Sequence, residues 1–165
     1  MPDEMVIMGV DAALSVTGIG ILRAGGDDME VIHTELIRTS AKQPLPNRLE
    51  KLHDSVCSLI NEFKPNILAL EDIFYSKNVK IALSLGQARG VILLACAQNG
   101  LRLEEFSARE IKQAVTGNGA ASKEQVAYMV KSLLNLHGDF ETFDISDSLA
   151  AALCMGYKIN SPTLS

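Results

Sequence analysis

The sequence predicts an α/β domain in which helices cover both faces of a mixed five-stranded sheet. Three short apolar runs joined by turn residues open the chain, which is typical of antiparallel strands. Later apolar runs of strand length alternate with segments in which apolar residues recur at helical spacing. The chain has 165 residues and is 47% hydrophobic, enough for one domain with one core. We expect a single domain over residues 1–158 and a frayed tail over residues 159–165.

The three opening strands are predicted from apolar runs that turn residues separate. Residues 6–10 form the first run, which ends at Asp11, and residues 18–24 form the second. Glycines and aspartates at residues 25–28 indicate a turn. Residues 30–39 then alternate as a third strand, so the three strands are expected to pair as an antiparallel meander.

An amphipathic helix and a buried strand are predicted next. Pro44 and Pro46 interrupt the chain, and apolar residues then recur at helical spacing from Leu49 to Phe63. Residues 67–70 have the continuous apolar pattern of a buried strand.

The second half of the chain is mostly helical. Residues 79–99 are apolar around most of a helix circumference, which predicts either a central core helix or a subunit interface. The other predicted elements are a strand over residues 101–106, a short helix capped by Ser107, a helix opened by the capping box of Ser122 and Gln125 and ending near residue 136, and a last helix over residues 144–157.

The distribution of charge matters more than the net charge of -5, which by itself argues against a nucleic-acid partner. Residues 74–134 contain eight basic and four acidic residues, so this segment carries +4 and the remainder carries -9. A basic face beside an acidic pocket fits both values, and ordinary solvated helix faces fit them too. The eight basic residues are Lys77, Lys80, Arg89, Arg102, Arg109, Lys112, Lys123 and Lys131.

Nothing in the composition indicates secretion or a membrane. The N-terminal residues lack the basic segment of a signal peptide, and the most apolar stretch, residues 91–97, is too short to cross a bilayer. Cys57, Cys96 and Cys154 are widely spaced and odd in number, which indicates core residues of a reducing compartment. We expect a cytoplasmic protein without membrane contact.

Four carboxylates occupy places where a metal site can form. Asp11 ends the first predicted strand and Glu71 ends the fourth, and these strands can be parallel neighbours in a mixed sheet. Asp144 and Asp147 stand three residues apart at the start of the last helix, so they share one face. Four like charges need cations between them, and hard divalent ions such as Mg2+ suit carboxylate ligands. Two such ions about 3.5–4 Å apart would activate a water and stabilise the leaving oxygen of a phosphodiester.

Each of these acids also has an ordinary interpretation when taken alone. Asp11 or Glu71 could make a turn or capping contact at the end of its strand. Asp144 could be a helix N-cap, and Asp147 could complement the helix dipole. The metal site is favoured because all four fit one arrangement of the predicted elements.

Four segments match, in order and spacing, the motifs of a known nuclease family. They are Gly9-Val10-Asp11 with Thr17-Gly18-Ile19-Gly20; Leu70-Glu71-Asp72-Ile73-Phe74 with Lys77-Asn78 and Leu85-Gly86-Gln87-Ala88-Arg89-Gly90-Val91; Ser107-Ala108-Arg109-Glu110-Ile111-Lys112 with Lys123 and Gln125; and Asp144-Ile145-Ser146-Asp147-Ser148-Leu149-Ala150. Over residues 6–155 the chain therefore resembles the RuvC-type Holliday-junction resolvases.

The resemblance implies an RNase H-like fold and a homodimer that cuts four-way DNA junctions by paired symmetric nicks in recombination and repair. It implies Mg2+, with Mn2+ as a substitute, held by the four carboxylates as catalytic residues. Lys112 and Lys123 match lysines near the scissile phosphate, where an ammonium group offsets developing negative charge. A branch-migration motor complex is a further candidate partner.

The remaining predicted DNA contacts combine aromatic and basic side chains. Aromatic rings among lysines can stack on unpaired bases while the lysines hold phosphates. The predicted contacts are Phe74, Tyr75, Lys77, Lys80, Arg89 and Arg109. We expect the basic residues to gather on the face that carries the carboxylates.

The chain departs from the family pattern in two places. Ala12-Ala13 follows Asp11 where the family has Pro-Gly, and this change affects the turn that carries a predicted ligand. The chain is also acidic and ends without the basic extension of the family, which predicts weaker or more salt-sensitive DNA binding.

Three other functions stay open on the sequence alone. The segment from Val10 to Ser15, with Thr17-Gly18, faintly resembles the phosphate loop of actin-like ATPases, although such enzymes need two lobes. A non-catalytic junction-binding protein is a second alternative, which the four carboxylates disfavour because they would repel phosphates. The third is an RNase H-like nuclease that cuts RNA–DNA hybrids.

Overall fold

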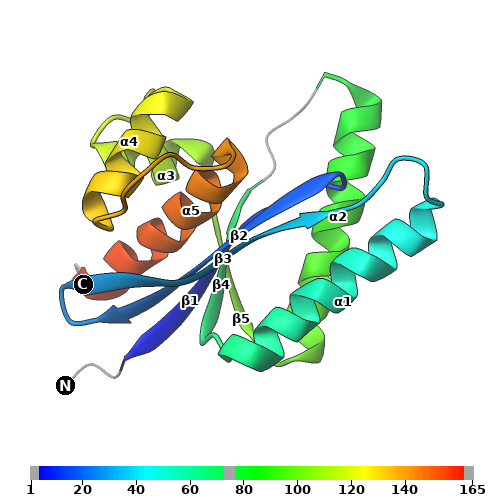
Figure 1. Ribbon diagram of the computed structural model, residues 1–165, viewed down its shortest axis with the longest axis horizontal. Helices are drawn as coiled ribbons and strands as arrows, with labels where there is room; N and C mark the ends of the chain where they lie inside the picture. The colour runs from blue at the N-terminus through cyan, green and yellow to red at the C-terminus, as the bar shows by residue number, and fades with distance from the viewer. Residues whose placement is uncertain (1–3, 73–76, 162–165) are drawn as a thin grey trace.

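The computed structural model describes residues 4–72 and 77–161, and these form the predicted mixed α/β fold (Figure 1). The strands are β1 (Met5–Asp11), β2 (Val16–Gly25), β3 (Asp28–Arg38), β4 (Ile67–Glu71) and β5 (Arg102–Phe106). The helices are α1 (Leu45–Phe63), α2 (Val79–Gln98), α3 (Ala108–Thr116), α4 (Lys123–Leu133) and α5 (Phe143–Asn160).

The five strands form one mixed sheet in the order β3-β2-β1-β4-β5. β1, β2 and β3 pair in antiparallel fashion as the predicted meander. β4 joins β1 in parallel, and β5 joins β4 in parallel. The carboxyl ends of β1, β4 and β5 therefore lie at one end of the sheet.

Helices cover both faces of the sheet, as predicted. α1 and α2 lie on one face, and α3, α4 and α5 lie on the other (Figure 1). Alternate residues of β1 point to opposite faces: Ile7 belongs to the core under α5, and Met8 to the core under α1. The same alternation decides which face receives the carboxylates at the strand ends.

The start of α1 and the end of α5 are among the element boundaries that differ from the prediction. α1 begins at Leu45, since Pro46 sits in its first turn, where its missing N–H costs no hydrogen bond. α5 continues to Asn160, whose side-chain amide donates to the Gly26 carbonyl at 2.8 Å. The predicted frayed tail over residues 159–165 is therefore wrong for its first residues, and residues 162–165 lie outside the described part of the chain.

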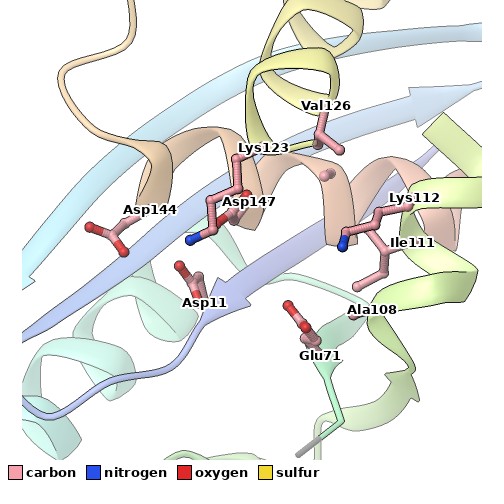
Figure 2. A pocket seen from close by; sticks show the side chains of 10 residues that line it. Asp11, Glu71, Ala108, Ile111, Lys112, Lys123, Val126, Asp144 and Asp147 are labelled. Atoms are coloured by element: carbon pink, nitrogen blue, oxygen red, sulfur yellow. The ribbon is translucent and has the colours of Figure 1, made fainter. Parts of the chain in front are cut away.

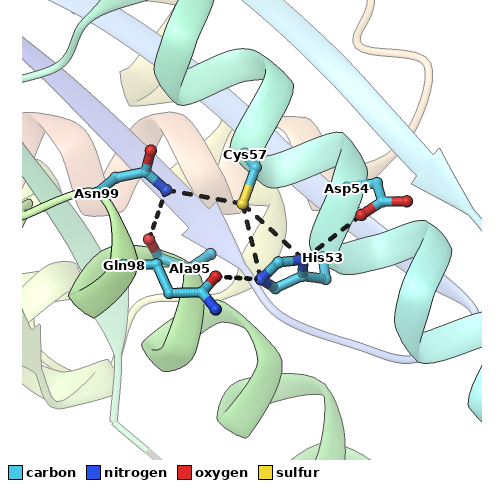
Figure 3. A network of polar contacts seen from close by, with 6 residues as sticks. All are labelled: His53, Asp54, Cys57, Ala95, Gln98 and Asn99. Carbon is cyan, nitrogen blue, oxygen red and sulfur yellow. Dashed lines mark hydrogen bonds and ion pairs between the residues drawn. The ribbon is translucent and has the colours of Figure 1, made fainter.

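α1 and α2 contact one another near the C-terminal end of α2. His53 Nε2 lies 2.7 Å from Gln98 Oε1, and the Asn99 amide donates to the Cys57 sulfur at 3.6 Å (Figure 3). The two helices thus form one layer on the sheet.

α2 leaves much of its apolar surface exposed. By length and composition alone, α2 could also cross a membrane. The prediction that the most apolar stretch is too short to do so considered residues 91–97 and not the whole helix. One side of α2 nevertheless packs on the sheet, where Ile92 is fully buried. The opposite side carries exposed apolar residues.

Candidate metal centre and active site

All four predicted carboxylates and both predicted catalytic lysines line one cavity of about 310 Å³. The lining residues are Asp11, Glu71, Ala108, Ile111, Lys112, Lys123, Val126, Asp144, Asp147 and Ala150. Figure 2 shows the charged side chains converging from β1, β4, α3, α4 and α5 on a common space. Segments up to 136 residues apart in the sequence thus build one site.

The pairing of β1 with β4 places Asp11 beside Glu71. Val10 pairs with Leu70 in the parallel register, so the next residue of each strand is a carboxylate. Val10 and Leu70 are buried under α1 and α2. Because side chains alternate along a strand, Asp11 and Glu71 both point to the other face, where α5 lies.

α5 brings Asp144 and Asp147 to the same face. The helix begins at Phe143 with Thr142 as its N-cap residue, so Asp144 stands in the first turn and the alternative of an Asp144 N-cap is wrong. Asp147 follows three residues later on the same side of the helix. Both carboxylates therefore reach over the end of β1.

Three glycines allow α5 to approach the strands closely. A Cβ atom on Gly18 would lie 2.1 Å from the Asp144 carbonyl oxygen, and a Cβ atom on Gly9 or Gly20 would also collide with α5. In the sequence these glycines stand out only as parts of motifs. Their physical role is to bring the start of α5 against β1 and β2.

Two capped helices deliver the lysines. Ser107 and Glu110 form a capping box that starts α3, which carries Lys112. Ser122 and Gln125 form the predicted capping box of α4. Lys123 is the first residue of that helix.

The lysines lie against the carboxylates. Lys123 Nζ is 3.9 Å from Asp147 Oδ2, and 68% of the Lys123 side chain stays exposed. The Glu71 carboxylate points toward the Lys112 ammonium group (Figure 2). Both ammonium groups can therefore reach a phosphate that enters the open side of the cavity.

Burial and neighbouring negative charge together perturb Asp11 strongly. Burial is the largest cause that raises the pKa of Asp11 to about 8, and the charges of Asp147, Asp144 and Glu71 and a hydrogen bond with Asp144 contribute to the same shift. That hydrogen bond joins the Asp11 and Asp144 side chains. At neutral pH this carboxyl group holds a proton unless a cation takes its place.

Glu71 and Asp147 have raised pKa values for a similar reason. Burial is the main cause for both, and the Asp147 charge adds to it at Glu71. The charges of Lys112 and Lys123 act in the opposite direction on both groups. The two lysines thus offset part of the shift, and burial keeps both pKa values raised.

A divalent cation fits the donor set by charge and chemistry. Carboxylate oxygens are hard ligands, and the four acids face one cavity with incomplete charge compensation. Among residues 4–72 and 77–161, however, no three acidic, histidine or cysteine side chains form a group ready to hold a metal ion, so the prediction of one metal-sized cluster is wrong for this arrangement.

The predicted DNA contacts are less concentrated than expected. Phe74 and Tyr75 lie outside the described residues. Lys77 and Lys80 are exposed at the start of α2, and Arg109 is exposed on α3. None of these three lines the cavity.

Some basic residues of segment 74–134 form ion pairs with acidic residues outside the cavity. This corrects the prediction that the basic residues share one face. Arg102 pairs with Glu104 at 2.6 Å, and it lies at the end of β5 away from the site. Lys131 pairs with Asp139 at 2.9 Å. The cavity lysines are therefore the basic residues that the structure places at the site.

The prediction of Arg89 as a DNA contact is wrong. It is only 7% exposed, and its guanidinium donates to the Glu71 carbonyl at 2.5 Å and pairs with Glu105 at 2.9 Å. A buried guanidinium with these partners is not available to phosphate. The available signal was its position on the core-facing side of an apolar helix, at spacing that also buries Ile92 and Cys96.

The turn after Asp11 is held without the Pro-Gly of the family pattern. Thr17 is fully buried, and its hydroxyl donates to the Ala13 carbonyl at 2.5 Å. The Thr39 hydroxyl donates to the Leu14 carbonyl at 2.5 Å. One buried and one half-buried threonine thus fix the loop that follows Asp11.

Comparison with known proteins gives a consistent result. The family model for crossover junction endodeoxyribonuclease RuvC matches residues 7–155. A crossover junction endodeoxyribonuclease RuvC of Natranaerobius thermophilus is 42% identical over 150 residues, covering 91% of this chain and 93% of the relative. One from Halothermothrix orenii is 42% identical over 158 residues, covering 94% and 96%.

A solved structure gives the same assignment. Thermus thermophilus RuvC in complex with a Holliday junction substrate superposes with a TM-score of 0.89 and 29% identity, covering 94% of this chain and 95% of that one. The fold is therefore RNase H-like. With its four carboxylates in one cavity at the ends of β1, β4 and α5, the chain belongs to the RuvC family of crossover junction endodeoxyribonucleases.

Proposed function

We propose that this chain is a divalent-metal-dependent endonuclease that resolves four-way DNA junctions by paired symmetric nicks in recombination and repair. The observation that carries the proposal is the cavity in which four carboxylates and two lysines face one another (Figure 2). RuvC nucleases are metal-dependent, and the Thermus thermophilus relative was solved with a Holliday junction. Its close structural similarity supports four-way junction DNA as the substrate.

We assign the metal to Asp11, Glu71, Asp144 and Asp147, as two Mg2+ ions with Mn2+ as a substitute. Bound divalent cations lower the pKa of water and offset charge on a phosphodiester and its leaving oxygen. Lys112 and Lys123 provide ammonium groups on the cavity wall. These groups stabilise negative charge that develops on the scissile phosphate.

The proposed contacts beyond the cavity are Lys77, Lys80 and Arg109, all exposed, together with Phe74 and Tyr75. Lysine and arginine side chains bind phosphates without regard to sequence, so these contacts would position the junction. The aromatic rings would stack on bases that the junction leaves unpaired.

A homodimer is proposed from one face of α2. The side of this helix opposite the core presents Val79, Leu83 and Leu94, which are 70%, 61% and 51% exposed. Between them lie Gly86 and Gly90, where an added Cβ would meet nothing within 4 Å. Large apolar side chains on both sides of two glycines suit close packing against α2 of a second copy.

Two copies related by a twofold axis would carry two active sites, which explains paired nicks in a symmetric junction. The branch-migration motor complex and the cytoplasmic location stay predictions from the sequence.

The experiment that tests the proposal compares substrates. A synthetic four-way junction, a linear duplex of the same sequence and an RNA–DNA hybrid are each incubated with the protein and Mg2+. We expect paired nicks in the junction, little cleavage of the other two, and no cleavage when EDTA replaces Mg2+. Preferential cleavage of the hybrid would favour a different RNase H-like nuclease, and junction binding without cleavage would favour a non-catalytic binding protein.

A further inference from the structure

Arg89 connects α2 to the strand that carries Glu71. Its Nη1 donates to the Glu71 carbonyl at 2.5 Å, and its Nη2 lies 2.9 Å from Glu105 Oε1 and 3.9 Å from Asp72 Oδ1. Glu71 is the last residue of β4, Asp72 follows it directly, and Glu105 belongs to β5. One guanidinium thus joins the carboxyl ends of two neighbouring strands.

The guanidinium approaches from the face opposite the cavity. Arg89 lies on α2 between Ala88 and Ile92, both of which belong to the core under α1 and α2. The Glu71 side chain points to the other face of the sheet, into the cavity. Arg89 therefore contacts the backbone of Glu71 and leaves its carboxylate available to other groups.

The contact of Arg89 with the Glu71 carbonyl restrains the end of β4. Arg89 is only 7% exposed, and a buried guanidinium is costly unless its N–H groups are bonded. Its planar fork fixes the direction of each bond, which an ammonium group does not do. Any shift of the Glu71 carbonyl would therefore break a charge-assisted hydrogen bond that is largely shielded from water.

We infer that Arg89 is a positioning residue, which fixes the end of β4 so that the Glu71 carboxylate is directed into the metal-binding cavity. The inference rests on the proposed nuclease function. Partners that orient a metal ligand typically contribute about 10–100-fold to metal affinity or activity, although they do not touch the metal. Arg89 has this relation to Glu71 through the backbone.

The position of Arg89 also couples the site to the exposed side of α2. Gly90 follows Arg89 directly and belongs to the proposed dimer face. A change in the packing of α2 would therefore move the guanidinium and, through it, the end of β4. Formation of the dimer would in this way help to order the metal site.

The test uses the full chain with the substitutions Arg89→Met, Arg89→Lys and Glu105→Gln. Arg102→Met is the matched control. It breaks an Arg–Glu pair on β5, the strand that carries Glu105, at the end of that strand away from the site. Val56→Ala is the stability control, since it leaves a cavity in the core under α1 without touching β4. The measurements are the Mg2+ dependence of junction cleavage, Mn2+ binding by electron paramagnetic resonance, junction affinity in Ca2+, and the melting temperature.

We expect Arg89→Met to raise both the Mg2+ concentration for half-maximal cleavage and the Mn2+ dissociation constant by about tenfold or more. Junction affinity should change little. Arg89→Lys should keep part of the metal affinity that Arg89→Met loses, and Glu105→Gln should raise the Mn2+ dissociation constant by less than Arg89→Met does. Both controls should bind Mn2+ as the unmodified protein does. Unchanged Mn2+ binding in Arg89→Met and Glu105→Gln would overturn the inference, as would equal losses in Arg89→Met and Val56→Ala.

If Arg89→Met does not fold, Glu105→Gln and Arg89→Lys still decide the matter through Mn2+ binding. Failure of the proposed function would look different. In that case the unmodified protein itself would leave the junction uncut in Mg2+.

Discussion

The side chain of Asp11 on β1 hydrogen-bonds the side chain of Asp144 on α5. Ionised carboxylates only accept hydrogen bonds, so this contact requires a proton on one of the two groups. Burial and the neighbouring carboxylates raise the pKa of Asp11 to about 8, which is consistent with such a proton. The cavity thus holds more negative charge than the fold accommodates without a proton or a cation.

The stability of the metal-free protein should fall as pH rises from about 4 to about 8. Over this interval the folded protein binds more protons than the unfolded chain, because Asp11 titrates near 8 when folded and near 3.8 otherwise. Urea unfolding in EDTA at several pH values measures this slope. Asp11→Asn should flatten it, and Asp27→Asn, in the exposed turn between β2 and β3, should not. A slope that persists unchanged in Asp11→Asn would contradict the assignment.

Substitution of any one cavity carboxylate should reduce cleavage by a few orders of magnitude. The changes are Asp11→Asn, Glu71→Gln, Asp144→Asn and Asp147→Asn, which keep side-chain volume and remove a metal ligand. Junction binding should stay near normal or become tighter, because each change also removes negative charge near phosphate. Single-turnover cleavage and gel-shift binding measure the two effects. Asp54→Asn on α1 is the control, and a cavity variant with full activity would not be a metal ligand.

Reversing the charge of either cavity lysine should impair cleavage strongly. Lys112→Glu and Lys123→Glu place negative charge where the scissile phosphate enters, so the rate and the binding should both fall. Lys42→Glu and Lys64→Glu change the net charge equally outside the cavity. Cleavage rates and the salt dependence of binding compare the four proteins. Equal effects from all four would remove the special role of Lys112 and Lys123.

Charged substitutions on the exposed face of α2 should separate the dimer. Leu83→Glu and Leu94→Glu place carboxylates in the middle of an apolar contact, which disfavours burial against a second copy. Light scattering at micromolar concentration should then give the mass of a monomer for each variant and the mass of a dimer for the unmodified protein. Tyr128→Glu, at another exposed position, is the control. A monomeric unmodified protein, even with junction present, would contradict the dimer.

Adding a methyl group at Gly18 should disturb the active site by displacing the start of α5. The new Cβ would lie 2.1 Å from the Asp144 carbonyl, so α5 must move and carry Asp144 with it. We expect Gly18→Ala to destabilise the protein by about 1–3 kcal/mol and to slow cleavage by about 100-fold. Gly25→Ala at the end of β2 is the control, because its nearest neighbour would be 4.0 Å away. Normal cleavage in Gly18→Ala would show that α5 tolerates the shift.

The order of elements and the convergence of the four acids were predictable from the sequence. Apolar runs that end on Asp11 and Glu71, and a helical spacing between Asp144 and Asp147, carry that information locally. The parallel pairing of β1 and β4 then follows from the fold that the motifs imply. These features depend on short segments, which is why pattern analysis recovers them.

Other features depended on contacts between distant segments. Arg89 looked like a DNA contact because its charge was visible in the sequence and its partners on β4 and β5 were not. The helical end of α5 was missed because Asn160 is held by the Gly26 carbonyl, 134 residues away.

The parallel register of β1 and β4 limits how this active site can change during evolution. Val10 pairs with Leu70, and the proposed ligands Asp11 and Glu71 follow at the next position of each strand. A slip of one residue would turn a carboxylate into the apolar layer beneath α1, and a slip of two would move it by about 6.6 Å along the sheet. The separation of these ligands can therefore change only in large discrete steps. Insertions and deletions in this family should accordingly collect in loops and spare both strands.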